Sequence, residues 1–184
     1  MKEKIENAVK GIQMEKDRER EPHYRFLLSV AQNNPELLME YWDVFARMLK
    51  KPDVSNPYCA IHLIAELVRA DDRDRFCEIF DDFYALLNHE SPVVSPHVAA
   101  KSGKILRAKP QLEDRIVPLL LAVDKTSRCR HLELQKAYVI EAFSEAFEVL
   151  RQKDRIIGFV RDQLGSESQK TRKAARAFLK DKGL

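Results

Sequence analysis

A dipeptide that recurs at a fixed interval is the feature that most constrains the fold of this chain. Asp-Arg occurs at residues 74–75, 114–115 and 154–155, so consecutive copies are 40 residues apart. Apolar residues follow each copy at the same offsets, beginning with Phe76, Ile116 and Ile156. A period near 40 residues is typical of stacked repeats, in which each unit covers the hydrophobic face of the next. The pattern therefore favours a repeat architecture over a conventional single-core enzyme fold.

Composition indicates that the repeats are helical. The 184 residues include 5 Gly and 8 Pro, too few for the many tight turns of an all-β fold. Charged residues make up 33% of the chain, as expected when helices expose long polar faces. The first residues lack the apolar run of a signal peptide and no segment approaches ~20 apolar residues, so neither a signal peptide nor a membrane span is expected. Three cysteines without short spacing favour reduced thiols, and we expect a cytoplasmic protein without a membrane partner.

Periodicity predicts four helix pairs between residues 22 and 165, inside a single domain that covers residues 1–184. Residues 1–21 are predicted to form an N-terminal helix and a charged connector, which is either an exposed helix end or a linker. Pro22 is expected in the first turn of the first pair, where the missing N–H of proline is not needed. Residues 166–184 are expected to form a capping helix with a polar outer face, as terminal repeats do.

Several residues inside the predicted repeats have an expected structural role. Gly103 lies within a predicted helix, where it costs about 1 kcal/mol relative to Ala, and a close helix–helix approach is the simplest explanation. Pro118 lies within another helical pattern, so we expect a kink there. Each Asp of the repeated dipeptide is predicted to lie at the entry of a second helix, where its carboxylate can accept hydrogen bonds from free N–H groups.

These features resemble the HEAT-repeat family, and armadillo repeats are a related family with three helices per unit. The resemblance rests on antiparallel pairs of about 35–40 residues, an acidic turn inside each pair and a proline near the start of first helices. It covers about residues 22–182, although here the Arg follows the Asp directly and does not come several positions later. It implies an all-α fold, an α-α superhelix of about four antiparallel helix pairs plus a terminal half repeat. It also implies binding of proteins, and less often of nucleic acids, far more than catalysis.

The leading hypothesis is a non-catalytic scaffold that binds a protein partner and carries no cofactor. The resemblance implies that second helices line the concave side, so their charged residues outside the core are the candidate binding residues. These candidates are Glu40, Asp43, Arg47, Arg75, Glu78, Asp82, Glu113, Arg115, Arg155 and Asp162. Binding at this surface would couple to the curvature of the array, because each repeat contacts only its neighbours.

An uneven charge distribution supports nucleic-acid binding as the alternative. Residues 71–90 contain seven acids and two bases, whereas residues 151–184 contain ten bases and four acids. The basic end could bind phosphates in a salt-dependent manner, or attract the acidic segment of another copy head to tail. No aromatic residues alternate with the bases, so stacking on single strands is not indicated, and a solvated cap is the simpler interpretation. The candidate residues are Lys170, Arg172, Lys173, Arg176 and Lys180.

A metal-dependent enzyme is the third and weakest hypothesis. Glu141, Glu145 and Glu148 follow i, i+4 and i+7, so they share a helix face that could hold a divalent metal. No Glu-x-x-His motif accompanies them, and a solvated acidic stripe is favoured. Cys59 and His62 could be two ligands of a zinc ion, but no second pair with suitable spacing completes the site. The sequence also contains no glycine-rich phosphate-binding loop. We therefore expect no metal or cofactor.

Overall fold

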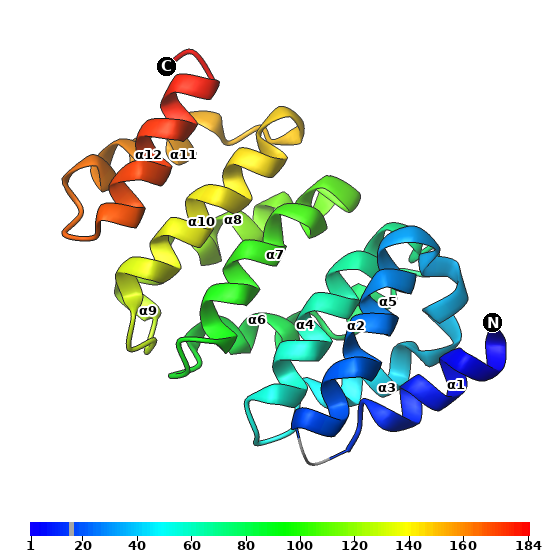
Figure 1. Cartoon of the computed structure of the whole chain (residues 1–184). Coiled ribbons are helices and arrows are strands. Elements are labelled where there is room, and N and C mark those ends of the chain that lie inside the picture. The colour runs from blue at the N-terminus through cyan, green and yellow to red at the C-terminus, as the bar shows by residue number, and fades with distance from the viewer. Residues whose placement is uncertain (15–16) are drawn as a thin grey trace. The chain divides into compact units, whose positions relative to one another are not determined.

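The computed structural model describes residues 1–14 and 17–184, in which every regular element is helical and no strand occurs. The α-helices are α1 (Lys2–Gly11), α2 (Asp17–Asn33), α3 (Trp42–Met48), α4 (Ser55–Leu67), α5 (Arg75–Glu78), α6 (Phe80–Ala85), α7 (Val94–Ala108), α8 (Glu113–Leu121), α9 (Val123–Thr126), α10 (Leu132–Ala146), α11 (Lys153–Asp162) and α12 (Gln169–Asp181) (Figure 1). Short 3-10 helices join or extend them: η1 (Pro35–Tyr41), η2 (Val68–Ala70), η3 (Leu86–Asn88), η4 (Pro110–Leu112), η5 (Phe147–Val149) and η6 (Gln163–Gly165). The predicted all-α fold class is confirmed.

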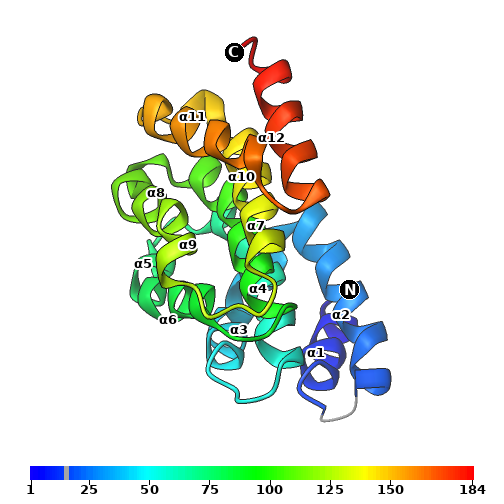
Figure 2. The ribbon, with the colours of Figure 1, turned by 90° about the vertical axis from the view of Figure 1, so that its left-hand side faces the viewer.

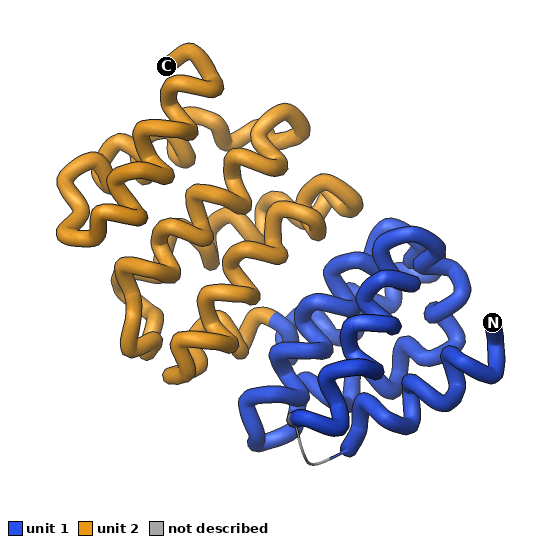
Figure 3. Tube along the Cα trace, in the orientation of Figure 1, with its two compact units in different colours: residues 1–83 blue, residues 84–184 orange. Residues whose placement is uncertain are grey.

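The chain divides into two compact units, residues 1–83 (unit 1) and residues 84–184 (unit 2) (Figure 3). In unit 1, α2 packs against both α1 and α4, and α3 packs against α4. In unit 2, α7, α10 and α12 run side by side with α10 in the middle, while α8 and α11 form a second layer (Figures 1 and 2). Consecutive helices of each pair therefore lie in different layers of unit 2. The organisation of residues 1–184 as one domain stays a prediction.

The core of unit 1 is formed by apolar stripes that the helical period brings onto one side of each helix. The apolar stripe of α1, formed by Ile5, Ala8, Val9 and the C-cap residue Ile12, is entirely buried. Large aromatic side chains are buried in this core, and Phe76 of α5 and Phe83 of α6 meet edge to face with ring centroids 5.4 Å apart. Burial of these residues is the main stabilising term of the unit.

The core of unit 2 is built around α10, which is covered on two sides by α7 and α12. Gly103 of α7 faces α10 so closely that an added Cβ would lie 2.8 Å from the backbone oxygen of Ala142. The predicted close approach at Gly103 is thus confirmed. At the other side of the unit, Phe147 and Phe178 pack edge to face with their ring centroids 5.1 Å apart, which joins η5 to α12.

Several predicted helix boundaries are wrong. α2 begins at Asp17, so Pro22 lies inside the helix and not in its first turn. The preceding charged residues continue the helix because they find partners: Nε of Arg20 donates to the Met14 carbonyl at 2.9 Å, and Arg25 pairs with Glu21. Residues 17–21 are therefore the helix end and not a linker, while Glu15 and Lys16 lie outside the described residues. Two second helices are also interrupted, as η1 followed by α3 and as α5 followed by α6.

The repeated Asp residues lie at the entries of second helices, as predicted, but they do not cap these helices. Asp74 precedes α5 with φ = 52°, in the left-handed region, and its carboxylate accepts no capping hydrogen bond because N-caps need an extended backbone. Asp71 fills that role, accepting hydrogen bonds at 3.0 Å from the backbone N–H groups of Arg75 and Phe76. Asp114 and Asp154 lie within the first turns of α8 and α11, where Leu112 and Gln152 are the N-cap residues without capping side-chain bonds.

α8 continues through Pro118 to Leu121, and the kink expected at this proline stays a prediction. Across the described part of the chain, no helix is both long enough and apolar enough to cross a bilayer.

Candidate functional site

Two candidate partner-binding residues of unit 1, Asp43 and Arg75, are brought together as a link between helix pairs. Arg75 donates from Nη2 to Oδ1 of Asp43 at 2.7 Å and from Nη1 to the Met39 carbonyl at 2.9 Å. Its guanidinium also lies 5.6 Å from the centroid of the Trp42 ring. The side chain of Arg75 is only 24% exposed, so its main role is to hold α5 against η1 and α3.

The other candidates of unit 1 remain at the surface. Asp82 pairs with Lys50 at 2.8 Å, and Glu40 and Glu78 are exposed. Arg47 lines a polar hollow of about 420 Å³ together with Arg20 and Asp53. Partial burial there opposes ionisation of Asp53, but hydrogen bonds from Asn56 and the charge of Arg20 hold the pKa of this carboxyl below its usual value.

Glu113, predicted as a surface residue for a partner, is buried, with 1% of its side chain exposed. Its carboxylate accepts hydrogen bonds from the backbone N–H groups of Arg151 at 2.8 Å and Gln152 at 2.7 Å, and from Nε of Arg151 at 3.1 Å. The prediction was wrong because this acid points inward to close the turn before α11. Its neighbour Asp114 points outward and pairs with Nη2 of Arg151 at 3.0 Å.

The remaining candidates of unit 2 lie on the exposed sides of α8 and α11. Arg115 is exposed on α8, and Arg155 and Asp162 are exposed on α11. Leu119 adds an apolar side chain that is 38% exposed. Gly158 lies between Arg155 and Asp162, and beyond its chain neighbours and the α11 backbone no atom of the described residues lies within 4 Å of the position that its Cβ would occupy. Sequence reasoning missed Gly158, although a glycine within a helical pattern is a visible signal.

The acidic stripe, formed by Glu141 and Glu145 of α10 and Glu148 of η5, joins helices. Glu141 lies 3.9 Å from Lys170, Glu145 lies 3.9 Å from Arg107, and Glu148 lies 3.0 Å from Lys182, distances measured between charged atoms. The hydrogen bond from Lys182 holds the pKa of Glu148 below its usual value. Each acid thus faces a base of a neighbouring helix, which weakens the metal-site hypothesis. Within the described residues, no group of three His, Cys, Asp or Glu side chains is arranged to hold a metal ion.

The predicted basic residues of α12 separate into three roles. Arg172 donates from Nη1 to the carbonyls of Ser166 at 2.6 Å and Glu167 at 2.8 Å, so it holds the turn before the helix. Lys170 lies over the Tyr138 ring, 3.8 Å from its centroid. The other three, opposite the buried face of α12, are exposed and make no hydrogen bond or ion pair with any residue that the structure describes; they are Lys173, Arg176 and Lys180.

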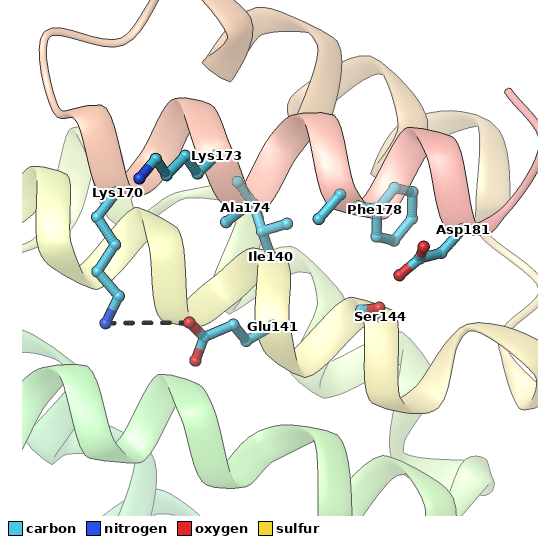
Figure 4. A pocket seen from close by; sticks show the side chains of 9 residues that line it. Ile140, Glu141, Ser144, Lys170, Lys173, Ala174, Phe178 and Asp181 are labelled. Carbon is cyan, nitrogen blue, oxygen red and sulfur yellow. Dashed lines mark ion pairs between the residues drawn. The ribbon is translucent and has the colours of Figure 1, made fainter.

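A shallow groove of about 330 Å³ lies between α10 and α12 (Figure 4). The groove was not predicted from the sequence. It forms because small residues on both helices leave space that larger side chains would fill. Its apolar lining is formed by Ile140, Ala174, Ala177 and Phe178. Its polar rim is formed by Glu141, Ser144, Lys170, Lys173 and Asp181.

Comparison with known proteins supports the fold but supplies no activity. No protein-family model matches the chain, and no curated protein matches it either. Among solved structures, an engineered protein of the Northeast Structural Genomics Consortium matches with a TM-score of 0.58 at 15% identity, covering 96% of this chain and 78% of its own. A designed armadillo repeat protein matches with a TM-score of 0.51 at 13% identity, covering 96% of this chain and 98% of its own. The chain therefore has an armadillo/HEAT-like helical-repeat fold.

Proposed function

We propose that this chain is a non-catalytic helical-repeat scaffold that binds a protein partner through the exposed sides of α8 and α11. The observation that carries the proposal is the open position of Gly158 between Arg155 and Asp162. A glycine inside a helix costs about 1 kcal/mol relative to alanine. At Gly103 internal packing explains this cost, whereas at Gly158 no neighbouring atom does. Close approach of a partner to the α11 backbone supplies an explanation.

The exposed side chains of α8 and α11 are suited to a protein interface. Arg115 and Arg155 provide guanidinium groups, which are enriched at interfaces because they form directed hydrogen bonds and stack on aromatic rings. Leu119 adds apolar area, and Asp162 adds the opposite charge. Mixed charges around a small apolar area favour a folded protein over a polyanion, which would be repelled by Asp162. The engagement of Glu141, Glu145 and Glu148 by bases supports a non-catalytic role.

The test is quantitative capture of proteins from a lysate of the source organism. The test variant exchanges charges on α11 (Arg155→Glu with Asp162→Arg) and keeps the net charge. The control variant makes the same exchange at the same seven-residue spacing on α1 (Glu3→Lys with Lys10→Glu), at two exposed positions. A partner of the proposed surface is retained by the wild type and the control but reduced at least about tenfold by the α11 variant, a change of about 1.4 kcal/mol. Equal retention by all three proteins would contradict the proposal.

A second candidate function is nucleic-acid binding by α12, favoured by the exposed row Lys173, Arg176 and Lys180, which lacks partners among the described residues. If these three bases neutralise three phosphates of a duplex, log K falls against log salt with a slope of about −2.7. Fluorescence anisotropy of a labelled duplex at several KCl concentrations measures that slope. Replacing all three with Gln should abolish binding, whereas replacing the exposed Lys2, Lys4 and Lys10 with Gln removes equal charge and should leave it unchanged.

A further inference from the structure

We infer that the groove between α10 and α12 is a docking site for a short extended peptide segment with acidic residues at one end and aliphatic residues in its middle. The groove lies between two first helices of unit 2, away from the residues of α8 and α11 on which the proposed function rests. It would therefore be a second binding surface, and its test is independent of the first.

The walls of the groove have the composition of a peptide site. Ala174 and Ala177 of α12 line the groove with small side chains. Ile140 and Phe178, each 1% exposed, lie at its apolar base (Figure 4). Ser144 faces this space from α10 and offers a hydroxyl group to a peptide backbone. Peptide-sized sites are mostly apolar with a few polar groups that fix orientation.

Charge distinguishes the two ends of the groove. Lys170 and Lys173 lie at the end formed by the first turn of α12, and Asp181 lies at the other end (Figure 4). Lys173 has no partner among the described residues, whereas Lys170 lies 3.9 Å from Glu141 and also lies over the Tyr138 ring. Burial first, and then the charges of Lys101 and Lys170, lower the pKa of His97, which agrees with a positive potential at this end. An acidic side chain is therefore the complement of this end and a basic one is the complement of Asp181.

The length of the groove sets the length of the segment. Lys170 and Asp181 are separated along α12 by a rise of about 16 Å. Five residues of extended chain span about 17 Å at most. A pentapeptide of this length can place two acids beside Lys170 and Lys173, two leucines along the apolar lining and one lysine beside Asp181. Lys173 would gain a charge-assisted contact that it lacks within the chain.

The outer row of α12 offers a built-in control. Arg176 belongs to the same helix as Lys173 and has the same charge, but it does not line the groove. A peptide that docks in the groove distinguishes between these two bases. A polyanion that is attracted to the whole helix, such as a nucleic acid, does not distinguish between them.

The experiment titrates isotope-labelled full-length protein with acetylated Asp-Asp-Leu-Leu-Lys amide and with its reversed sequence, observing backbone amides by NMR. We expect saturable shifts for at least one peptide, centred on Ser144, Ala174 and Ala177, and none with the uncharged peptide Asn-Asn-Leu-Leu-Gln. Lys173→Gln should raise Kd by about tenfold, the loss of one charge-assisted contact. Ala177→Leu should also weaken binding by filling the groove, while Arg176→Gln should change Kd by less than about twofold.

Two results would overturn the inference. One is the absence of saturable shifts up to about 5 mM peptide, which corresponds to less than about 3 kcal/mol of binding free energy. The other is an equal loss of affinity in Lys173→Gln and Arg176→Gln, which would assign the attraction to the whole helix and favour the nucleic-acid candidate. Ala177 is exposed and Lys173 lies on the surface, so circular dichroism should show unchanged folding in both variants.

Discussion

In unit 1 the turn before α5 is closed by an acid of its own loop, whereas in unit 2 the turn before α11 is closed by an acid of the preceding helix pair. Asp71 accepts two backbone hydrogen bonds from residues four and five positions later. Glu113 accepts two from residues 38 and 39 positions later. A short-range acid stabilises one turn, but a long-range acid also fixes the distance between successive pairs. The same local task therefore has different consequences for the stacking of repeats.

Removing Glu113 should have the largest effect. Glu113→Ala removes the acceptor of two part-buried backbone N–H groups and of the Arg151 guanidinium, and we expect a loss of about 3 kcal/mol in the free energy of unfolding. Urea denaturation measures this loss. Glu113→Gln keeps one acceptor and should lose less. The neighbouring Asp114→Ala removes an exposed partner of the same arginine and should cost far less, because exposed ion pairs contribute little. Similar losses of unfolding free energy in Glu113→Ala and Asp114→Ala would contradict the special role of the buried acid in the turn before α11.

Asp71→Ala should have the next largest effect. It removes the acceptor of two N–H groups at the start of α5, which corresponds to about 2 kcal/mol. Because both bonds are local, hydrogen exchange should increase at Arg75 and Phe76 while α3 keeps its protection. Asp72→Ala, at the adjacent exposed position, is the matched control and should be nearly neutral. Faster hydrogen exchange in α3 of the Asp71→Ala variant would show that this acid also stabilises the contact between helix pairs.

Arg75→Ala should have an intermediate effect and would reveal the link between pairs in unit 1. The variant loses contacts to the Met39 carbonyl, Asp43 and the Trp42 ring, and we expect destabilisation by about 1.5 kcal/mol. Trp42 is the only tryptophan, so a change in its fluorescence reports directly on this link. Arg75→Lys keeps the charge but not the forked geometry, and should recover less than half of the stability. Unchanged fluorescence and stability in Arg75→Ala would show that the link contributes nothing.

Asp154→Ala should have the smallest effect, at most about 0.5 kcal/mol in urea denaturation. Asp154 is exposed in the first turn of α11, where only a weak interaction with the helix dipole remains. A loss as large as that of Glu113→Ala would restore the common capping role predicted for the repeated Asp residues.

The helical architecture could be predicted from the sequence alone, because the spacing of apolar residues along the chain determines which of them share the buried face of a helix. Ile5 and Ile12 of α1 illustrate this, since the same face contains both and both are buried. The inward direction of Glu113 could not be predicted, because its partners lie almost 40 residues away and Asp114 has the same chemistry. The partners of Glu141, Glu145 and Glu148 are also distant in the sequence, so their row looked like a free acidic stripe.

The candidate surfaces were only partly predictable for a related reason. The exposed row of Lys173, Arg176 and Lys180 followed from helical spacing, as did the exposure of Arg155 and Asp162. The groove between α10 and α12 depends on the distance between two helices, which no local pattern specifies. Gly103 and Gly158 are the same residue type in similar helices, and only the structure shows that one is packed and the other open.

Gly103 also limits how this array could be lengthened by protein engineering. An extra helix pair inserted between α7 and α10 would meet the bare backbone of α7 on one side and the Ala142 side of α10 on the other. Such an insert would need its own glycine facing α10 and an alanine-sized residue facing α7. Without them, both helix–helix interfaces would become wider. A duplicated copy that ignored this rule would assemble with widened seams, even if every other residue of its apolar stripe were retained.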